Sequence, residues 1–260
     1  MNTSNRSEKI TEADAFIRLL VIMDELRAKC PWDMKQTFET LRILTIEETY
    51  ELSDAILENN LSDIKEELGD ILLHMVFYAK LGEETGEFNI ADALHTVCNK
   101  LIKRHPHIYG DVKVNSEADV KRNWEQIKLA EGKKSVLSGV PPGLPAMIKA
   151  YRMQEKTAQV GFEWKDKKDV WSKVEEEINE FKAVADGTDM NRKEDEFGDI
   201  LFSLINYARY AGINPETALE RVNRKFKARF EYIEQNADKP LEDMTLNAMD
   251  VLWDQAKKLY

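Results

Sequence analysis

A set of six residues that occurs twice at one spacing constrains this chain more than any other feature of its sequence. The later copy consists of Glu176, Glu177, Glu180, Glu196, Gly198 and Asp199, and the earlier copy, 129 positions before it, consists of Glu47, Glu48, Glu51, Glu67, Gly69 and Asp70. A solvated helix face keeps the helical period but has no reason to keep six identities. The chain is therefore expected to contain two copies of one structural unit.

Each copy is predicted to form a pair of antiparallel helices. In the later copy, apolar residues recur at the helical period on both sides of a turn at residues 187–189. Asn191, followed by Glu194 three residues later, is predicted to open the second helix as a capping box. No segment shows a convincing strand pattern, so the predicted fold is all-α, with two bundle-like units.

Two carboxylates from each helix of the hairpin are expected to face one another. Glu177 and Glu180 are three residues apart, as are Glu196 and Asp199, so each pair projects from one side of its helix. Glu-rich helices are usually solvated faces, but four converging carboxylates repel one another unless a cation lies among them. All-oxygen ligation favours Mg²⁺ or Mn²⁺ over Zn²⁺. The same set in the earlier copy is Glu48, Glu51, Glu67 and Asp70.

The glycine in each set lies inside a predicted helix. Gly69 and Gly198 each cost about 1 kcal/mol there relative to alanine. The close approach of another helix or of a ligand is expected to explain both residues.

Composition narrows the classes of function. A chain of 260 residues is long enough for two ordinary domains, and its net charge of −11 argues against binding nucleic acid polymers or anionic membranes through a basic surface. Cys30 and Cys98 lie outside any C-x-x-C pattern, which favours a reducing compartment. No apolar run reaches the roughly 18 residues that a spanning helix needs, and the polar N-terminus shows no signal peptide. A cytoplasmic location is expected.

The chain is expected to have four regions. Residues 1–10 are predicted to be disordered, and a cap at Thr11 opens an N-terminal helical domain at 11–130. The linker is placed at 131–145, EGKKSVLSGVPPGLP, which holds three of the seven prolines. A C-terminal helical domain, predicted to be the catalytic one, occupies 146–260.

Eight short motifs together resemble one known family. They are CPWD at 30–33, EETYE at 47–51, EELGDIL at 66–72, KRHPHIYGD at 103–111, GFEW at 161–164, EEINE at 176–180, DEFGDIL at 195–201 and NRKFKARF at 223–230. In this combination the chain resembles the MazG family of nucleoside triphosphate pyrophosphohydrolases, in its two-repeat bacterial form. The resemblance covers nearly all of the chain after the first ten residues.

The resemblance implies an all-α fold that forms a homodimer through its helices. It also implies Mg²⁺-dependent hydrolysis of NTPs and dNTPs to the monophosphate and pyrophosphate. The metal ligands that it implies are the four carboxylates already singled out, Glu177, Glu180, Glu196 and Asp199, with Glu48, Glu51, Glu67 and Asp70 as the other copy, which is not expected to be the active one.

The attacking water needs a carboxylate that is not fully used by the metal. Glu176 and Glu177 are the candidates, and the sequence does not choose between them. Glu176 points away from its partners on the helix, so a solvated role is an equal alternative for it.

Basic and aromatic residues in the second half are candidates for contacts with the nucleotide. Lys225 and Arg229 lie at i and i+4 and are expected to bind phosphates; Trp253 is expected to stack on a base, with Lys257 one turn further on. Arg192 lies one turn before Glu196. Surface ion pairs, or core packing for Trp253, are the plain alternatives.

The N-terminal half lacks the obvious phosphate clamp. Leu101 and His105 occupy the positions aligned with Lys225 and Arg229. The C-terminal copy is therefore predicted to be the active one, with broad base specificity because stacking accepts any base. The N-terminal copy is predicted to serve folding and dimerisation.

Two alternatives stay open. One is a related all-α pyrophosphohydrolase with a narrower substrate, such as dUTP or phosphoribosyl-ATP. The other is a non-catalytic, metal-binding helical regulator. The sequence leaves open whether a substrate nucleotide is canonical, damaged or a signalling molecule.

Overall fold

The fold consists of helices. The computed structural model describes residues 4–116, 119–120, 123–124, 126–127, 131 and 135–259, and within these ranges it contains α-helices and short 3₁₀ turns and no strand. The all-α prediction is therefore confirmed. The chain divides into two compact units between Val112 and Lys113. The predicted linker lies partly outside the described residues, so the predicted domain boundaries stay predictions.

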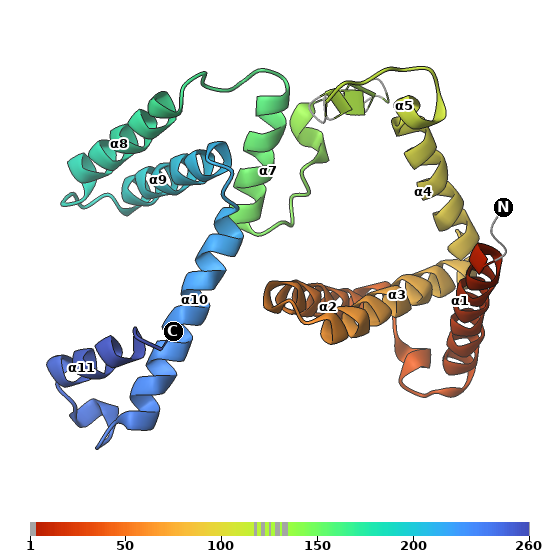
Figure 1. Cartoon of the computed structure of the whole chain (residues 1–260), viewed down its shortest axis with the longest axis horizontal. Coiled ribbons are helices and arrows are strands. Elements are labelled where there is room, and N and C mark those ends of the chain that lie inside the picture. The colour runs from red at the N-terminus through yellow and green to blue at the C-terminus, as the bar shows by residue number, and fades with distance from the viewer. Residues whose placement is uncertain are drawn as a thin grey trace. The chain divides into compact units, whose positions relative to one another are not determined.

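The first unit is built around a helical hairpin (Figure 1). Its elements are α1 (Ser4–Lys29), η1 (Asp33–Lys35), α2 (Phe38–Glu58), α3 (Leu61–Glu84), α4 (Ile90–Arg104) and α5 (Pro106–Tyr109). A capping box between Thr37 and Thr40 opens α2, and the Asn60 side chain accepts hydrogen bonds from the first turn of α3. Between these caps, Asn59 adopts a left-handed conformation with φ of 54°, which lets the chain reverse within two residues.

α1 begins earlier than predicted. Its first residue is Ser4 rather than the residue after a cap at Thr11. The segment from Ser4 to Thr11 contains the good helix formers Arg6, Glu8 and Lys9 and no glycine or proline that would break a helix. The end of α1 at Lys29, before Cys30 and Pro31, agrees with the restriction that a proline places on the residue before it.

The second unit repeats the hairpin and extends it. Its elements are η2 (Val136–Gly139), α7 (Ala146–Gln159), α8 (Lys167–Val184), α9 (Met190–Tyr210), α10 (Pro215–Asn236), η3 (Leu241–Asp243) and α11 (Leu246–Ala256). α8 begins 129 residues after α2, and α9 begins 129 residues after α3. The predicted repeat is therefore matched in both helices of the hairpin.

The cap of α9 is not the predicted one. Asp189 accepts a hydrogen bond from the backbone N–H of Arg192 at 3.2 Å, and α9 begins at Met190. Asn191 lies inside the first turn of the helix, so the capping box predicted at Asn191 is wrong. Asp and Asn cap equally well, and the extended backbone at Asp189 decided between them (φ −80°, ψ 100°).

Each unit has its own buried core. In the first unit, side chains from α1, α2 and α3 form one cluster of buried apolar residues, namely Met23, Leu41, Val76, Phe77 and Leu81. In the second unit, Val170 and Val174 of α8 are buried, and rings pair across α8 and α9 between Trp171 and Tyr207 and between Phe181 and Phe197, with centroids 4.9 and 5.6 Å apart. These contacts run along the hairpin and fix the level at which α8 faces α9.

Two expectations about the surroundings of the chain can be compared with the structure. A Cβ added at Gly69 or Gly198 meets no heavy atom of the described chain within 4 Å, so no helix of this chain approaches either glycine closely. Both positions face open space in this chain, so the close approach of a helix from a second chain, or of a ligand, stays a prediction. None of the described helices combines the length and the apolar character needed to cross a membrane.

We predict that the cap at Asp189 stabilises the α8–α9 hairpin. The substitution Asp189→Ala removes the acceptor for the Arg192 N–H and is expected to lower the free energy of unfolding by about 1 kcal/mol. Urea unfolding of the purified protein measures the loss. Asn191→Ala is the matched control and is expected to cost less than half as much; equal costs would contradict the observed cap.

Candidate active site

Three carboxylates of the second unit converge between α8 and α9. One oxygen each from Glu177 of α8 and from Glu196 and Asp199 of α9 lie within 4.8 Å of one another. Glu177 is only 6% exposed, whereas Asp199 is exposed, so the cluster is closed on the side of the helical core and open to solvent on the other. The ring contacts along the hairpin hold this arrangement against the mutual repulsion of the carboxylates.

The donor set fits a hard divalent cation. Oxygen ligands of one Mg²⁺ ion lie about 2.1 Å from the metal and hence at most about 4.2 Å from one another. Oxygens that lie within 4.8 Å of one another therefore need an inward shift to share an ion. The described residues of the cluster offer oxygen atoms alone, which suits Mg²⁺ or Mn²⁺.

Glu180 lies one turn further along α8 and at the edge of this cluster. Its side chain is exposed, and it is not one of the three converging residues. Partial desolvation, followed by the negative charges of Glu177 and Glu196, raises the pKa of Glu180. Its carboxylate thus lies in the field of the other predicted ligands without touching all of them.

Two cations border the cluster. Lys173 Nζ lies 2.8 Å from Glu176 Oε1 and 2.8 Å from Glu177 Oε1, and these two hydrogen bonds raise the pKa of Lys173. Arg192 Nε lies 3.9 Å from Glu196 Oε1 with an exposed side chain. Lys173 is not among the residues predicted from the sequence, although its position four residues before Glu177 is a signal that it shares that helix face.

The two candidates for the general base, Glu176 and Glu177, differ in position. Glu177 belongs to the converging set and is buried, whereas the Glu176 side chain is 55% exposed and bonded to Lys173. Both therefore lie within reach of the cluster, Glu176 from its outer side.

The first unit holds an equivalent cluster with different electrostatics. Oxygens of Glu48, Glu67 and Asp70 also lie within 4.8 Å of one another. Desolvation, together with the charges of Glu51, Asp70 and Glu67, raises the pKa of Glu48 to about 7. Among the described residues, Glu67 Oε2 is buried without a hydrogen-bond partner, which is an orphaned acceptor that a cation would satisfy.

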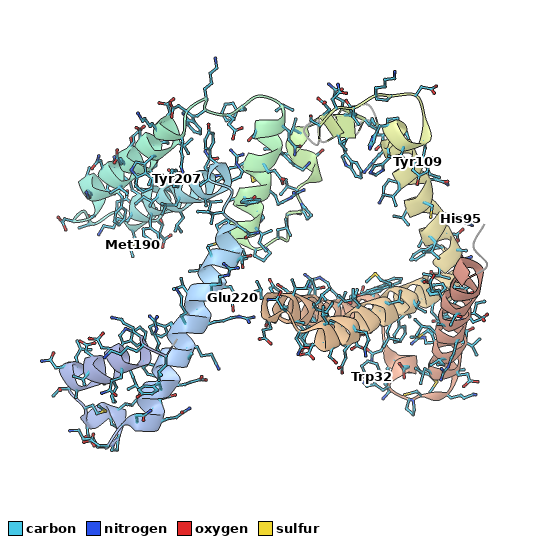
Figure 2. All side chains as sticks on the ribbon, in the orientation of Figure 1. Trp32, His95, Tyr109, Met190, Tyr207 and Glu220 are labelled. Carbon is cyan, nitrogen blue, oxygen red and sulfur yellow. The ribbon has the colours of Figure 1, made fainter. Side chains whose placement is uncertain are left out.

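The other predicted nucleotide contacts lie elsewhere in the second unit. The Arg229 guanidinium lies 5.7 Å from the Trp253 ring centroid, and Lys257 Nζ forms an ion pair with Asp254 at 2.9 Å. Lys225 precedes Arg229 by one turn on α10. Figure 1 shows that α11 packs on the half of α10 that points away from α8 and α9, beyond the residue Glu220 labelled in Figure 2. The structure brings these residues to one another and not to the carboxylates of their own unit.

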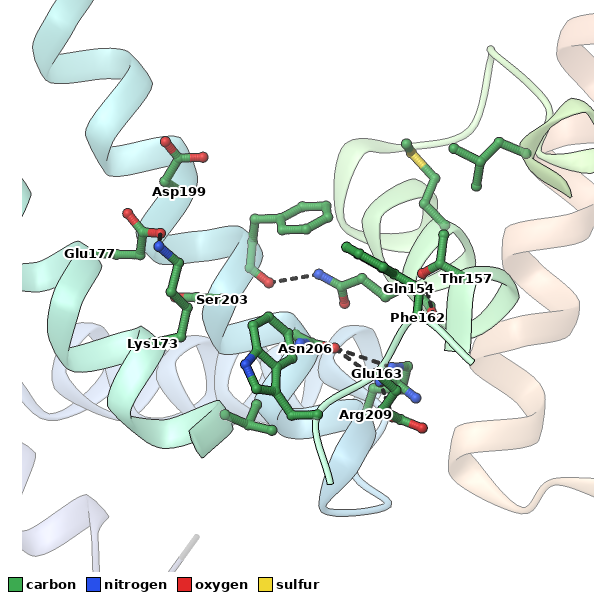
Figure 3. Close-up of a pocket in the computed structure, with 15 residues that line it drawn as sticks. Gln154, Thr157, Phe162, Glu163, Lys173, Glu177, Asp199, Ser203, Asn206 and Arg209 are labelled. Atoms are coloured by element: carbon green, nitrogen blue, oxygen red, sulfur yellow. Dashed lines mark hydrogen bonds and ion pairs between the residues drawn. The ribbon is translucent and has the colours of Figure 1, made fainter. Parts of the chain in front are cut away.

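A pocket of about 240 Å³ adjoins the carboxylate cluster (Figure 3). Glu177, Asp199 and Lys173 lie at one side of it, and α7 and the loop before α8 form the other side. Its wall is mostly apolar and aromatic, with Phe162 and Trp164 supplied by the loop. Phe162, Glu163 and Trp164 of the GFEW motif therefore form part of the wall of an open pocket.

Comparison with known proteins shows to which family the chain belongs. The family model described as "MazG nucleotide pyrophosphohydrolase domain" matches residues 36–109 and 166–233, together more than half of the chain. The chain is 44% identical over 250 residues to the Thermotoga maritima "Nucleoside triphosphate pyrophosphohydrolase/pyrophosphatase MazG", covering 93% of this chain and 95% of that protein. It is 40% identical over 253 residues to the Escherichia coli K12 "Nucleoside triphosphate pyrophosphohydrolase", covering 93% and 96%. It is also 47% identical to the Bacillus subtilis "Uncharacterized protein YabN", covering 91% of this chain and 50% of that protein.

The helical hairpins, their carboxylate clusters and these matches define a nucleotide pyrophosphohydrolase, an enzyme of the class that hydrolyses phosphoric anhydrides. The chain belongs to the MazG family and carries its domain twice. The resemblance found in the sequence motifs is confirmed.

We predict that the metal-free protein loses stability as the pH rises from about 4.5 to about 7. The pKa of Glu48 in the folded protein, about 7, lies above its ordinary value of 4.5, so the folded state binds this proton more tightly. The resulting stability is complete below pH 4.5 and is lost as the pH rises through 7. Thermal unfolding in EDTA across this range measures the effect.

The variant Glu48→Gln is expected to flatten this pH dependence. The neighbouring exposed residue supplies the matched control, Glu47→Gln, which is expected to keep it. An unchanged slope in Glu48→Gln would contradict the assignment.

Proposed function

We propose that this chain is a Mg²⁺-dependent nucleoside triphosphate pyrophosphohydrolase. It cleaves NTPs and dNTPs between the α and β phosphates, releases the monophosphate and pyrophosphate, and accepts different bases. The observation that carries the proposal is the convergence of Glu177, Glu196 and Asp199 beside an open apolar pocket. The names of the Thermotoga and Escherichia coli relatives support the same activity.

The proposed ligands of the ion are Glu177, Glu180, Glu196 and Asp199, with Mg²⁺ preferred and Mn²⁺ accepted. When bound, the ion supplies neutralisation of charge on the phosphate oxygens. Lys173 Nζ, which pairs with Glu176 and Glu177, would be able to pair with a phosphate instead once Glu177 holds the ion. Arg192, which is exposed beside Glu196, has the same role from α9.

The reaction itself needs an oriented water molecule. The water oxygen attacks the α-phosphorus, the bond to the α–β bridging oxygen breaks, and pyrophosphate leaves with that oxygen. Glu176 or Glu177 accepts the proton of the water, and the proposal keeps both as candidates. Glu176 is bonded to Lys173 rather than to the carboxylate cluster, which leaves its other oxygen available.

The group on α10 and α11 is proposed to contact the nucleotide as well. Lys225 and Arg229 would bind phosphates, with Trp253 and Lys257 beside them. Because their own unit places them away from the carboxylates, this role requires a second copy of the chain or a movement of α10. Contact between this group and the nucleotide therefore depends on the association of two chains or on a movement of α10.

We also propose a homodimer. Phe197 and Leu201 are 49% and 46% exposed on α9, and Gly198 between them faces open space, which leaves room for a second helix. The molar mass in solution, measured by light scattering, tests this proposal: the mass of a single chain would contradict it.

The N-terminal cluster is proposed to act mainly in folding and dimerisation. It keeps three converging carboxylates, but Leu44 stands where Lys173 stands in the later copy, 129 positions further on. The earlier cluster therefore has no lysine at this position that could leave a carboxylate and pair with a phosphate.

We predict that the two copies respond differently to the same substitution. Glu180→Gln removes a ligand from the proposed active cluster and is expected to lower AMP formation from ATP and Mg²⁺ by about a hundredfold or more. Glu51→Gln, the matched change in the earlier copy, is expected to retain most of the activity. Chromatography of the nucleotide products measures both. A large loss in Glu51→Gln with little loss in Glu180→Gln would reverse the assignment.

We predict broad base specificity. Values of kcat/KM for ATP, GTP, CTP and UTP are expected to agree within about tenfold, because stacking on an aromatic wall accepts any base. A hundredfold preference for one nucleotide, including dUTP or phosphoribosyl-ATP, would favour the narrower pyrophosphohydrolase. A protein that binds Mg²⁺ but hydrolyses none of these substrates would favour the non-catalytic regulator.

A further inference from the structure

We propose that Arg209 is a positioning residue for the hydrolytic reaction. Its guanidinium, on the last turn of α9, holds Glu163 of the loop between α7 and α8 and thereby keeps that loop in place beside the carboxylate cluster. The inference rests on the proposed function of that cluster. It adds a residue pair, Arg209 and Glu163, to which the proposed function gives no role.

Apolar packing holds the loop between α7 and α8 only weakly. The loop consists of residues 160–166, and its two rings, Phe162 and Trp164, are 78% and 42% exposed. Burial of apolar surface therefore contributes little to the position of the loop. At its first end, the Phe162 N–H donates to the backbone oxygen of Thr157 at 3.0 Å, just after Gly161 turns the chain with φ of 89°. The path of the residues that follow depends on contacts made by side chains.

The end of α9 supplies two of these contacts. Arg209 Nη2 donates to Glu163 Oε1 in an ion pair (Figure 3). The next residue, Tyr210, donates from its hydroxyl group to the backbone oxygen of Lys165 at 3.0 Å. The two contacts lie on either side of Trp164 in the sequence, so together they fix this part of the loop against α9.

The guanidinium is itself held in one orientation. Asn206 Oδ1, three residues earlier on α9, accepts a hydrogen bond from Arg209 Nη2 at 3.0 Å, and Asn206 is 8% exposed. A guanidinium presents its donors in a rigid fork, so this bond determines where the other donors point. The side chains of Arg209 and Glu163 are 13% and 31% exposed, which screens their attraction less than that of a fully exposed pair.

The first unit uses the equivalent position differently. Lys80 occupies the position 129 residues before Arg209, and its Nζ pairs with Asp24 of α1 at 2.6 Å. The aromatic loop of the first unit is held from α1, where Arg27 Nη1 donates to the backbone oxygen of Gln36 at 3.2 Å. The pairing of the second hairpin helix with the aromatic loop is thus found in the copy that has the open pocket.

The position of the loop affects the space that a substrate must enter. The loop forms one side of the pocket, and Glu177 and Asp199 of the carboxylate cluster lie at the other. A loop that occupies its binding position only part of the time lowers the apparent affinity for a ligand by that fraction. Arg209 therefore acts through Glu163, and its loss is expected to change KM rather than kcat.

The test is a double-mutant cycle on the ion pair. Glu163→Ala and Arg209→Ala each remove one partner, and a third variant carries both changes. KM and kcat are measured with ATP and Mg²⁺. We expect KM to rise about tenfold in each single variant and again about tenfold, instead of about a hundredfold, in the double variant, with kcat nearly unchanged.

Tyr210→Phe tests the second contact of the loop. Tyr210 is not part of the pocket wall, so a change in KM in this variant cannot come from a lost contact with the substrate. Removal of its hydrogen bond to the Lys165 oxygen is expected to raise KM about threefold.

The matched control is Arg152→Ala. Arg152 forms an ion pair with Glu155 on α7 and is not part of the pocket wall, so KM is expected to stay unchanged. Hydrogen exchange of the backbone amides at 161–166 is measured in all variants. It is expected to be faster in Glu163→Ala and Arg209→Ala and unchanged in Arg152→Ala. Circular dichroism checks that the variants fold.

The outcomes separate this inference from the proposed function. If the wild type hydrolyses ATP but Glu163→Ala leaves KM unchanged, or if the two losses multiply in the double variant, the positioning role is overturned and the proposed function stands. If the wild type hydrolyses no nucleoside triphosphate, the proposed function fails, and hydrogen exchange decides about the loop. Faster exchange in Glu163→Ala then supports Arg209 as the residue that positions the loop, whereas equal exchange overturns it.

Discussion

The mutual repulsion of carboxylates held at the α8–α9 interface is the constraint on which the site depends. Isolated in water, Glu177, Glu196 and Asp199 would separate; the packing of α8 against α9 keeps one oxygen of each within 4.8 Å of the others. The ring pairs Trp171–Tyr207 and Phe181–Phe197 lie along the same interface and resist that separation. Apolar packing between α8 and α9 therefore holds the carboxylates together against their repulsion, and a bound cation would reduce that repulsion.

The charges around the carboxylate cluster differ between the two copies of the hairpin. In the second unit Lys173 lies 2.8 Å from Glu177 and brings a positive charge to the cluster. In the first unit the corresponding residue is Leu44, and the pKa of Glu48 rises to about 7 because nearby carboxylates and burial are not offset. Phe77 closes the core of the first unit, whereas Asn206, 129 positions later, borders the open pocket of the second. These differences support the proposal that the first copy serves stability and the second copy catalysis.

Helical periodicity and capping residues predicted most of the helices. Residue type alone did not decide between two capping residues that were equally good. Asn60, Asn214 and Thr245 cap their helices, as their residue types favour. For α9, Asp189 and Asn191 were equivalent by residue type, and the geometry of the preceding turn selected Asp189. Lys225 and Arg229 on α10 were predicted to bind phosphates together because their i, i+4 spacing places them on one face of a helix. Such spacing carries no information on where that face points once the helix has left the hairpin.

The sequence by itself determined the all-α fold, the duplication, the family and the residues of both carboxylate clusters. These follow from helical periodicity and from identities at fixed separation, which are properties of the chain alone. Only the tertiary structure decided that Glu180 stands at the edge of its cluster, that Lys173 pairs with Glu177, and that an open pocket adjoins the site. Those features depend on which side chains from three separate helices fill a shared space. Packing of that kind is not encoded in any single segment.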